Sequence, residues 1–323
     1  MLEKNYLDIK TLKQLPTRQG FGEALVELGN ENPNVMAIGL DITDSVKTGM
    51  FRDKFPDRFI ECGIAEQNGM GIAAGLSLAG KVPFIATYGV FCPGRNWDQI
   101  RISVCYNKAN VKFSGAHGGI SVGPDGATHQ ALEDIALTRC LPNLTVLAPC
   151  DAIEAKKLTL AAGRMDGPVY MRFNRENTPV FTTEQTPFEI GRAQVFLEGK
   201  DVTIVGYGPI VHEALLAAEE LRKEGIEAEV INSPSIKPLD EKTILESVKK
   251  TGAVVSVEEH QVFGGLGSAV AELLAKNFPA PMEFVGMSDS FGESGQPSEL
   301  LKKYGMDREA IIEAAKKAIK RKK

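Results

Sequence analysis

Short apolar runs alternate with longer amphipathic stretches through the first half of the chain. Runs of this length that are rich in Val, Ile, Leu and Phe are typical of strands buried in a sheet. They lie at residues 35–40, 82–87, 111–115, 144–149 and 169–173. The stretches between them predict helices at 17–30, 66–79, 95–107, 130–139 and 151–163. This alternation predicts a parallel sheet with helices on both faces.

A second series of the same kind follows the polar segment 176–189, which contains Pro and Thr. Its strand patterns are DVTIVGYG, EAEVIN and AVVSVEE, and its helix patterns are IVHEALLAAEELRK, EKTILESVKK and GLGSAVAELLAK. The sequence therefore predicts two doubly wound α/β domains. We expect them to span residues 1–180 and 191–323, with a linker at 181–190.

Composition narrows the class of protein. A length of 323 residues is enough for two domains that each bury a core. The net charge of −5 disfavours a nucleic-acid partner. The chain lacks the apolar core of a signal peptide, and no run approaches the roughly 18 apolar residues of a membrane span. Five cysteines without a CxxC pair favour a reducing compartment, so we expect a cytoplasmic protein.

The stretch SGAHGGISVGPDGATHQ, residues 114–130, is unusually rich in chemically active side chains. It holds two of the four histidines, His117 and His129, together with Asp125 and five glycines. It follows a predicted strand, and ligands of such sheets bind beyond the carboxyl ends of strands. The stretch offers no fourth ligand and no HxxxH pair, which disfavours a metal site. Imidazoles suit proton transfer and the binding of hydroxyls or phosphate, so we predict a functional loop.

Other candidates have both a structural and a functional interpretation. Glu66 opens a helix of small residues, where a carboxylate either complements the helix dipole or hydrogen-bonds a ring nitrogen in an interface. Tyr88, Phe91 and Trp97 follow a strand end, where aromatic residues either belong to the core or stack on a flat heterocycle.

Three arginines suggest an anion. Arg172 and Arg175 follow a strand close to the His/Asp loop, and Arg18 lies at the start of the first predicted helix. A single arginine at a strand end is normally a surface residue. Several near one glycine-rich loop indicate phosphate binding, because guanidinium holds phosphate in a forked geometry.

Taken together, these residues resemble the C-terminal half of a transketolase, which comprises a pyrimidine-binding domain and a C-terminal domain. The resemblance rests on TRQGFGEAL, PDRFIECGIAEQN, VGPDGATHQ, INSPSIKPLD and VEEHQVFGGLG in this order. It implies thiamine diphosphate as cofactor. By this resemblance Glu66 is the catalytic glutamate that activates the aminopyrimidine, Tyr88 and Phe91 line the pyrimidine pocket, and Asp41 is a polar cofactor contact.

The resemblance also implies a substrate site. It assigns the substrate phosphate to His117, Arg18, Ser45 and Arg175. Asp125 matches a residue that recognises a sugar hydroxyl, and His129 matches a catalytic residue near the reacting oxygens. It leaves open whether Arg172 or Arg175 binds phosphate.

Two departures from the family pattern carry information. Gly94 stands where many relatives have a third aromatic residue, so Trp97 or a partner would have to fill the gap. The Gly-Asp-Gly motif that holds the diphosphate through Mg²⁺ is absent. The resemblance therefore implies one subunit of a split transketolase of the pentose phosphate pathway. An N-terminal-half partner would ligate Mg²⁺, giving a heterotetramer that moves a two-carbon ketol unit from a ketose phosphate to an aldose phosphate.

Three alternatives stay open. Deoxyxylulose-phosphate synthase shares GIAEQ and a similar loop but typically has Arg-Ala-Gly where this chain has Ala-His117-Gly. The β subunit of a 2-oxoacid dehydrogenase has the same two domains but does not need the sugar-phosphate residues. A non-catalytic subunit could keep the fold, because fold does not fix function.

Overall fold

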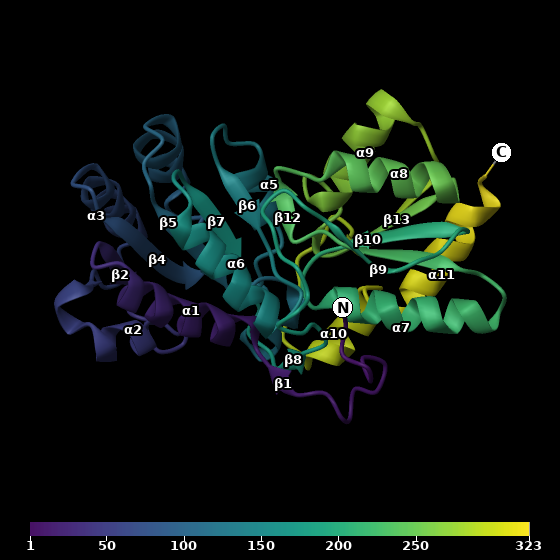
Figure 1. Cartoon of the computed structure of the whole chain (residues 1–323), viewed down its shortest axis with the longest axis horizontal. Coiled ribbons are helices and arrows are strands. Elements are labelled where there is room, and N and C mark those ends of the chain that lie inside the picture. Colours follow the sequence, from purple (N-terminus) through teal and green to yellow (C-terminus); the bar gives the residue numbers. More distant parts are fainter. Residues whose placement is uncertain (323) are drawn as a thin grey trace.

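The computed structural model describes residues 1–322 and contains two large sheets side by side (Figure 1). Within that range the first sheet has seven strands in the order β12-β6-β7-β5-β4-β2-β3. Its strands are β2 (Val35–Gly39), β3 (Phe59–Glu61), β4 (Val82–Tyr88), β5 (Lys112–Ala116), β6 (Thr145–Leu147), β7 (Val169–Arg172) and β12 (Ser235–Lys237). All neighbours are parallel except β12, which pairs antiparallel with β6.

Helices cover both faces of this sheet, as the alternating pattern predicts. They are α1 (Thr17–Glu31), α2 (Gly49–Lys54), η1 (Pro56–Arg58), α3 (Glu66–Leu78), α4 (Trp97–Gln99), η2 (Ile100–Tyr106), η3 (Ile120–Asp125), α5 (Asp134–Arg139) and α6 (Ala152–Arg164). One core places α1, α2 and α6 against the sheet, and the other places α3, η2 and α5 against its opposite face. The predicted doubly wound arrangement is confirmed.

The second sheet has five strands, counted within residues 1–322, in the order β14-β13-β10-β11-β9. They are β9 (Gln194–Leu197), β10 (Val202–Gly206), β11 (Ala228–Asn232), β13 (Val254–Gln261) and β14 (Met282–Met287). The helices of this half are α7 (Ile210–Lys223), α8 (Glu241–Thr251), α9 (Leu266–Asn277), α10 (Pro297–Lys303) and α11 (Arg308–Lys320). The helices α8 and α9 pack on one face, while α7 and α11 pack on the other.

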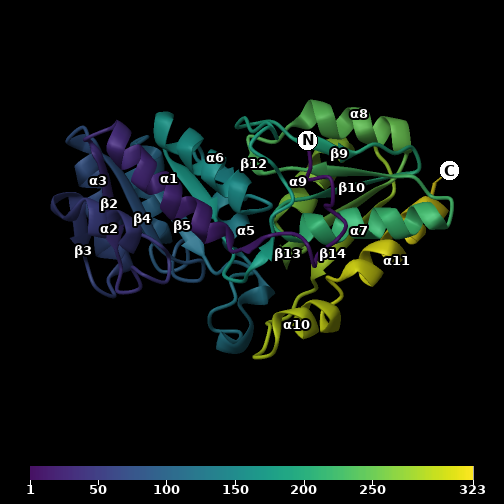
Figure 2. The same ribbon diagram turned by 60° about the horizontal axis from the view of Figure 1, so that its bottom comes forward.

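The two halves share structure at their junction. Strand β12 comes from the second half of the chain but joins the first sheet. In the other direction, the segment before α1 runs along the second half (Figure 2), where the Tyr6 carbonyl lies 2.7 Å from His212 Nε2. A small antiparallel ladder of β1 (Gln14–Leu15) and β8 (Thr178–Pro179) lies beside the junction. No helix in the described range is long and apolar enough to cross a membrane.

Two predicted helices begin later than expected. The helix expected from residue 95 begins at Trp97, and the helix expected from residue 130 begins at Asp134. Residues 130–133 instead serve tertiary contacts. The Gln130 amide donates to the Ile120 carbonyl, and the Ala131 carbonyl accepts from the Gly119 N–H. The Leu132 carbonyl likewise accepts from the Gln261 N–H. Backbone carbonyls engaged in this way favour an irregular segment over a helical turn.

Candidate active site

The predicted substrate residues meet at the carboxyl edge of the first sheet. Ser45 follows β2, His117 follows β5 and Arg175 follows β7, while Tyr88 ends β4. Arg18 reaches them from the first turn of α1. Loops at this edge gather because parallel strands all end there, so residues far apart in the sequence become neighbours.

Arg18, Ser45, Tyr88 and His117 form a connected group. Arg18 Nη1 donates to the Ser45 carbonyl at 2.7 Å and lies 3.4 Å from His117 Nε2. The Ser45 and Tyr88 hydroxyl oxygens are 3.1 Å apart. The rings of Tyr88 and His117 have centroids 4.0 Å apart. The group is therefore preorganised by contacts within this one chain.

His117 is held neutral in this group. Burial, and then the charges of Arg18 and Arg175, lower its pKa to about 3. His117 can therefore bind an anion only through a neutral N–H. Because arginine is only a donor, Nε2 accepts from Arg18 and the ring proton is on Nδ1. Within residues 1–322 this buried Nδ1 has no hydrogen-bond partner, which suits a bound ligand.

Positive charge gathers around His117. Burial and then the charge of Arg175 lower the pKa of Arg18, so the two guanidinium groups disfavour one another. An anion placed between them would relieve this repulsion. Arg175 is 31% exposed, and its Nη1 lies 3.1 Å from Asp125 Oδ1 and 2.8 Å from the Val122 carbonyl. Asp125 thus lies beside Arg175, at the end of the glycine-rich loop.

Arg172, in contrast to Arg175, is buried and makes its contacts within the chain. It is 2% exposed, pairs with Asp134 at 3.0 Å, and donates to the Ala131 and Glu259 carbonyls. Burial is the largest single influence and opposes its charge, but Asp134, Tyr207, Tyr170 and Glu259 together outweigh burial and raise the pKa of Arg172. Arg172 joins the two halves of the chain, and Arg175 is the more accessible of the two arginines.

The glycine-rich loop is held by the second half of the chain. The Ser121 N–H donates to the buried carboxylate of Glu259 at 3.1 Å. Gly119 has a φ of +90°, and a Cβ there would lie 2.4 Å from Glu259 Oε2. Only glycine accommodates both the backbone conformation and the close carboxylate.

Tyr88, Phe91 and His129 make an aromatic surface beside the cationic group. The ring of His129 meets Phe91 edge-on at 5.5 Å and Tyr88 at 5.8 Å between centroids. His129 Nδ1 lies 2.9 Å from the Thr128 hydroxyl. The structure thus brings His129 to the two aromatic residues assigned to the pyrimidine pocket.

Glu66 meets an arginine that the sequence analysis did not single out. Glu66 is 5% exposed at the start of α3, and its Oε1 accepts from Arg95 Nη1 at 3.0 Å. The Arg95 guanidinium also lies over the Phe91 ring, 3.8 Å from its centroid. Glu66 and Arg95 line an open hollow of about 470 Å³. The available signal was an arginine four residues after Phe91, in a loop that follows a strand end.

Gly94 and Trp97 have local structural explanations. A Cβ at Gly94 would lie 2.1 Å from the Val90 carbonyl oxygen, so no aromatic side chain fits there. Trp97 packs against the core and donates its indole N–H to the Leu137 carbonyl at 2.7 Å. Arg95, rather than Trp97, therefore lies beside Phe91.

Asp41 lies at the edge of this region. It is exposed directly after β2, with a φ of +68°, and its N–H donates to Glu61 at 2.8 Å. Among residues 1–322 no three His, Cys, Asp or Glu side chains are grouped to hold a metal ion.

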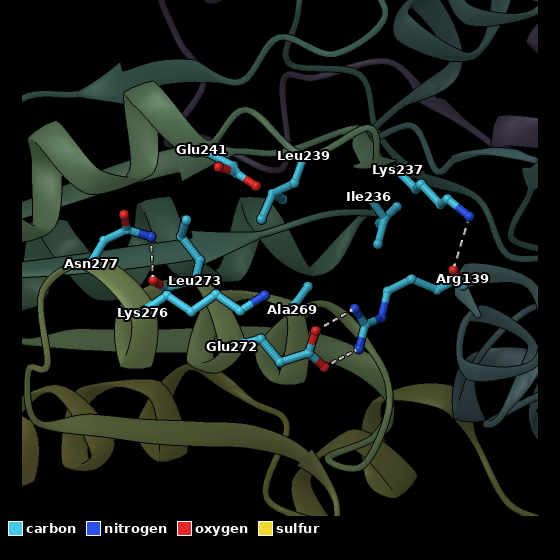
Figure 3. Close-up of a pocket in the computed structure, with 10 residues that line it drawn as sticks. All are labelled: Arg139, Ile236, Lys237, Leu239, Glu241, Ala269, Glu272, Leu273, Lys276 and Asn277. Carbon is cyan, nitrogen blue, oxygen red and sulfur yellow. Dashed lines mark hydrogen bonds and ion pairs between the residues drawn. The ribbon is translucent and has the colours of Figure 1, made fainter. Parts of the chain in front are cut away.

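A separate pocket lies where the two halves of the chain meet (Figure 3). It has a volume of about 270 Å³ and contains no residue of the predicted site. Arg139 from α5 pairs with both oxygens of Glu272 from α9, at 3.1 and 2.6 Å (Figure 3). Lys237 donates to the Arg139 carbonyl at 3.2 Å. These contacts hold the two halves together.

Comparison with protein families identifies the class to which this arrangement belongs. Residues 13–180 match the transketolase pyrimidine-binding domain, and residues 191–311 match the transketolase C-terminal domain. The chain belongs to the transketolase family.

Individual relatives show which kind of transketolase chain it is. A putative transketolase C-terminal section of Methanocaldococcus jannaschii is 43% identical, covering 94% of this chain and 96% of the relative. A 6-deoxy-6-sulfo-D-fructose transketolase subunit of Clostridium sp. strain MSTE9 is 40% identical over 94% and 95% of the two chains. A solved split-gene transketolase, described as an inactive β4 tetramer, is 48% identical with a TM-score of 0.90, covering 96% of this chain and all of that one. The protein is a split transketolase-family subunit.

Proposed function

We propose that this chain is the pyrimidine-binding and C-terminal half of a thiamine-diphosphate-dependent transketolase. With an N-terminal-half partner that ligates Mg²⁺, it would move a two-carbon ketol unit from an anionic ketose to an anionic aldose. The connected group of Arg18, Ser45, Tyr88 and His117 carries this proposal. It offers a buried, unpartnered N–H within residues 1–322 beside two cations, as an anionic sugar requires.

The residues present fit the aminopyrimidine part of the cofactor. Glu66 presents a largely buried carboxylate at the hollow, and the Phe91 ring lies under the Arg95 guanidinium that borders the same hollow. Glu66 would accept a hydrogen bond from a ring nitrogen and hold a proton there, while Phe91 would stack on the ring. The chemistry supplied by bound thiamine diphosphate is a nucleophilic carbon and an electron sink.

The remaining residues would act on the sugar. His117 would donate its Nδ1–H, and Arg18 and Arg175 would pair with the anionic end of the substrate. Asp125 would accept from a sugar hydroxyl, and Arg175 already fixes its position. His129 would move a proton at a substrate hydroxyl, because its ring borders the aromatic surface.

The anionic end group is phosphate or sulfonate. Both are tetrahedral oxyanions that guanidinium groups bind in a similar geometry. Phosphate follows from the family resemblance, and sulfonate is suggested by the relative named as a 6-deoxy-6-sulfo-D-fructose transketolase subunit. Phosphate carries the greater charge near neutral pH, so two cations in one pocket favour the phosphorylated sugar.

A ketol-transfer assay tests the proposal. The chain would be assayed alone and with an N-terminal-half transketolase chain, in thiamine diphosphate and Mg²⁺, with xylulose 5-phosphate as donor and ribose 5-phosphate as acceptor. We expect turnover only with both chains. A parallel arm with 6-deoxy-6-sulfofructose as donor compares the two end groups, and a lower kcat/KM is expected for it.

The other results would redirect the assignment. Turnover by this chain alone would contradict a split enzyme. An assembled complex that binds the cofactor but is silent with both donors would favour another thiamine-dependent reaction. A complex that forms without binding the cofactor would favour a non-catalytic subunit.

A further inference from the structure

Arg95 lies between two groups that the proposed function assigns to the cofactor. Its Nη1 donates to the Glu66 carboxylate at 3.0 Å, and its Cζ lies over the Phe91 ring, 3.8 Å from the centroid. A flat cationic group that stacks on an aromatic face and donates to a carboxylate makes the same two contacts as an aminopyrimidine.

The backbone of Arg95 is held by hydrogen bonds, while its side chain is free to move away from Glu66 and Phe91. The Gln67 amide donates to the Arg95 carbonyl at 3.2 Å, and the neighbouring Asn96 amide reaches the Glu66 carbonyl at 3.5 Å. These contacts tie the loop to α3. The side chain, in contrast, is 48% exposed and borders the open hollow beside Glu66. A half-exposed arginine can therefore swing into solvent without disturbing the loop.

We propose that Arg95 is an internal ligand of the cofactor site, which the aminopyrimidine ring must displace to reach Glu66 and Phe91. This inference rests on the proposed function. In the unliganded chain Arg95 satisfies the Glu66 carboxylate and covers the Phe91 face. Both contacts end when the ring binds, and the side chain moves into the hollow or toward the partner.

The expected change in cofactor affinity follows from competition between Arg95 and the aminopyrimidine ring for one site. A site that is available only part of the time has an apparent affinity reduced by the available fraction. A half-exposed ion pair and a single cation–π contact are weak, so an occupancy of about four-fifths is reasonable. Removal of Arg95 should then tighten cofactor binding about fivefold.

The test is a calorimetric titration of the assembled two-chain complex with thiamine diphosphate in the presence of Mg²⁺. Arg95→Met keeps an unbranched apolar stem but removes the charge and the donors. We expect its Kd for the cofactor to be about fivefold lower than that of wild type. Arg95→Lys keeps the charge but lacks the planar guanidinium, so its Kd should lie between those of wild type and Arg95→Met.

A matched control comes from the same region. Arg101 is exposed in η2 and lines a different hollow with Cys105 and Tyr106. Arg101→Met should bind the cofactor as wild type does. An Arg95→Met complex that binds no more tightly than wild type, or more weakly, would overturn the role of Arg95 alone. A wild-type complex that binds no cofactor would overturn the proposed function and this inference together.

Discussion

The two ends of the candidate site are built differently. The anion-binding end joins Arg18, Ser45, Tyr88 and His117 through several contacts within one chain. The ring-binding end has one carboxylate, Glu66, closed by a single half-exposed arginine beside an open hollow. The anion-binding end is thus preorganised, whereas the ring-binding end is left for other groups to complete.

The exposed surface along α3, the helix that Glu66 begins, supports this distinction. Gly71 and Gly75 of α3 have nothing within 4 Å of an added Cβ, and Ile64 and Leu78 are more than 70% exposed. Small and apolar residues on an exposed helix suit close contact with another chain. The comparison therefore predicts that substitutions at the ring end act on turnover and cofactor binding, while those at the anion end act on substrate binding.

The largest expected effect is at the ring end. Glu66→Gln keeps the size of the side chain but removes the proton acceptor, so kcat of the assembled complex should fall about 10²- to 10⁴-fold. Assembly, measured by light scattering after size exclusion, should be unchanged. Glu23→Gln, at an exposed position of α1, is the matched control and should keep full turnover. Retained turnover in Glu66→Gln would remove Glu66 from the mechanism.

Arg175→Met tests the anion end. Loss of a charged hydrogen bond should raise KM for a phosphorylated donor about 10- to 100-fold. The effect on kcat should be small, because the bond is made to the bound substrate and to the transition state alike. Steady-state kinetics with an unphosphorylated ketose provide the control, since KM for that donor should rise less, through the loss of the Arg175 contact to Asp125 alone. An equal rise for both donors would contradict an anion-specific role.

Gly119→Ala tests how Glu259 holds the glycine-rich loop at the anion-binding end. The positive φ and the contact with Glu259 should destabilise the chain by roughly 2 kcal/mol. Thermal or denaturant unfolding of the isolated chain measures the change. The matched control is Gly71→Ala, which adds a Cβ into open space in a helix and should raise stability by about 0.5–1 kcal/mol. Equal effects of the two substitutions would show that Glu259 does not constrain the loop.

The buried imidazole predicts a pH dependence of stability. His117 has a pKa of about 3 in the folded chain, against an ordinary value of 6.5. Between these values the unfolded chain binds a proton that the folded chain does not, so stability falls as the pH falls below about 6.5. His117→Gln should flatten this slope by up to about 1.4 kcal/mol per pH unit.

Denaturant unfolding from pH 7 to pH 5 measures this change. Burial also lowers the pKa of His212, so part of the slope should remain in the variant. An identical slope in wild type and His117→Gln would contradict a neutral, buried His117.

The sequence predicted most of the long strands and helices of the first sheet and the first part of the second, together with the residues that matched family motifs. It missed the short strands β3, β9 and β12, because strands of three or four residues at sheet edges carry little pattern. It also made no prediction for β14, α10 and α11 near the end of the chain. It also assigned residues 130–133 to a helix, where tertiary hydrogen bonds to Ile120 and Gly119 prevail.

The contacts of Arg95 and Glu259 could not be predicted from the sequence for a different reason. Each acts through a contact with a residue far away in the chain, Arg95 with Glu66 and Glu259 with Ser121. Such contacts depend on how the loops fold together and leave no local periodicity. The neutral state of His117 likewise follows from its burial between two arginines, which only the folded chain shows.

The most direct test of the central comparison is the binding of thiamine diphosphate, with Mg²⁺, to this chain alone and to the assembled complex. We predict no detectable binding to the isolated chain at cofactor concentrations that saturate the complex, because the ring end is incomplete. Binding of equal affinity to the isolated chain would show instead that this chain contains a complete cofactor site.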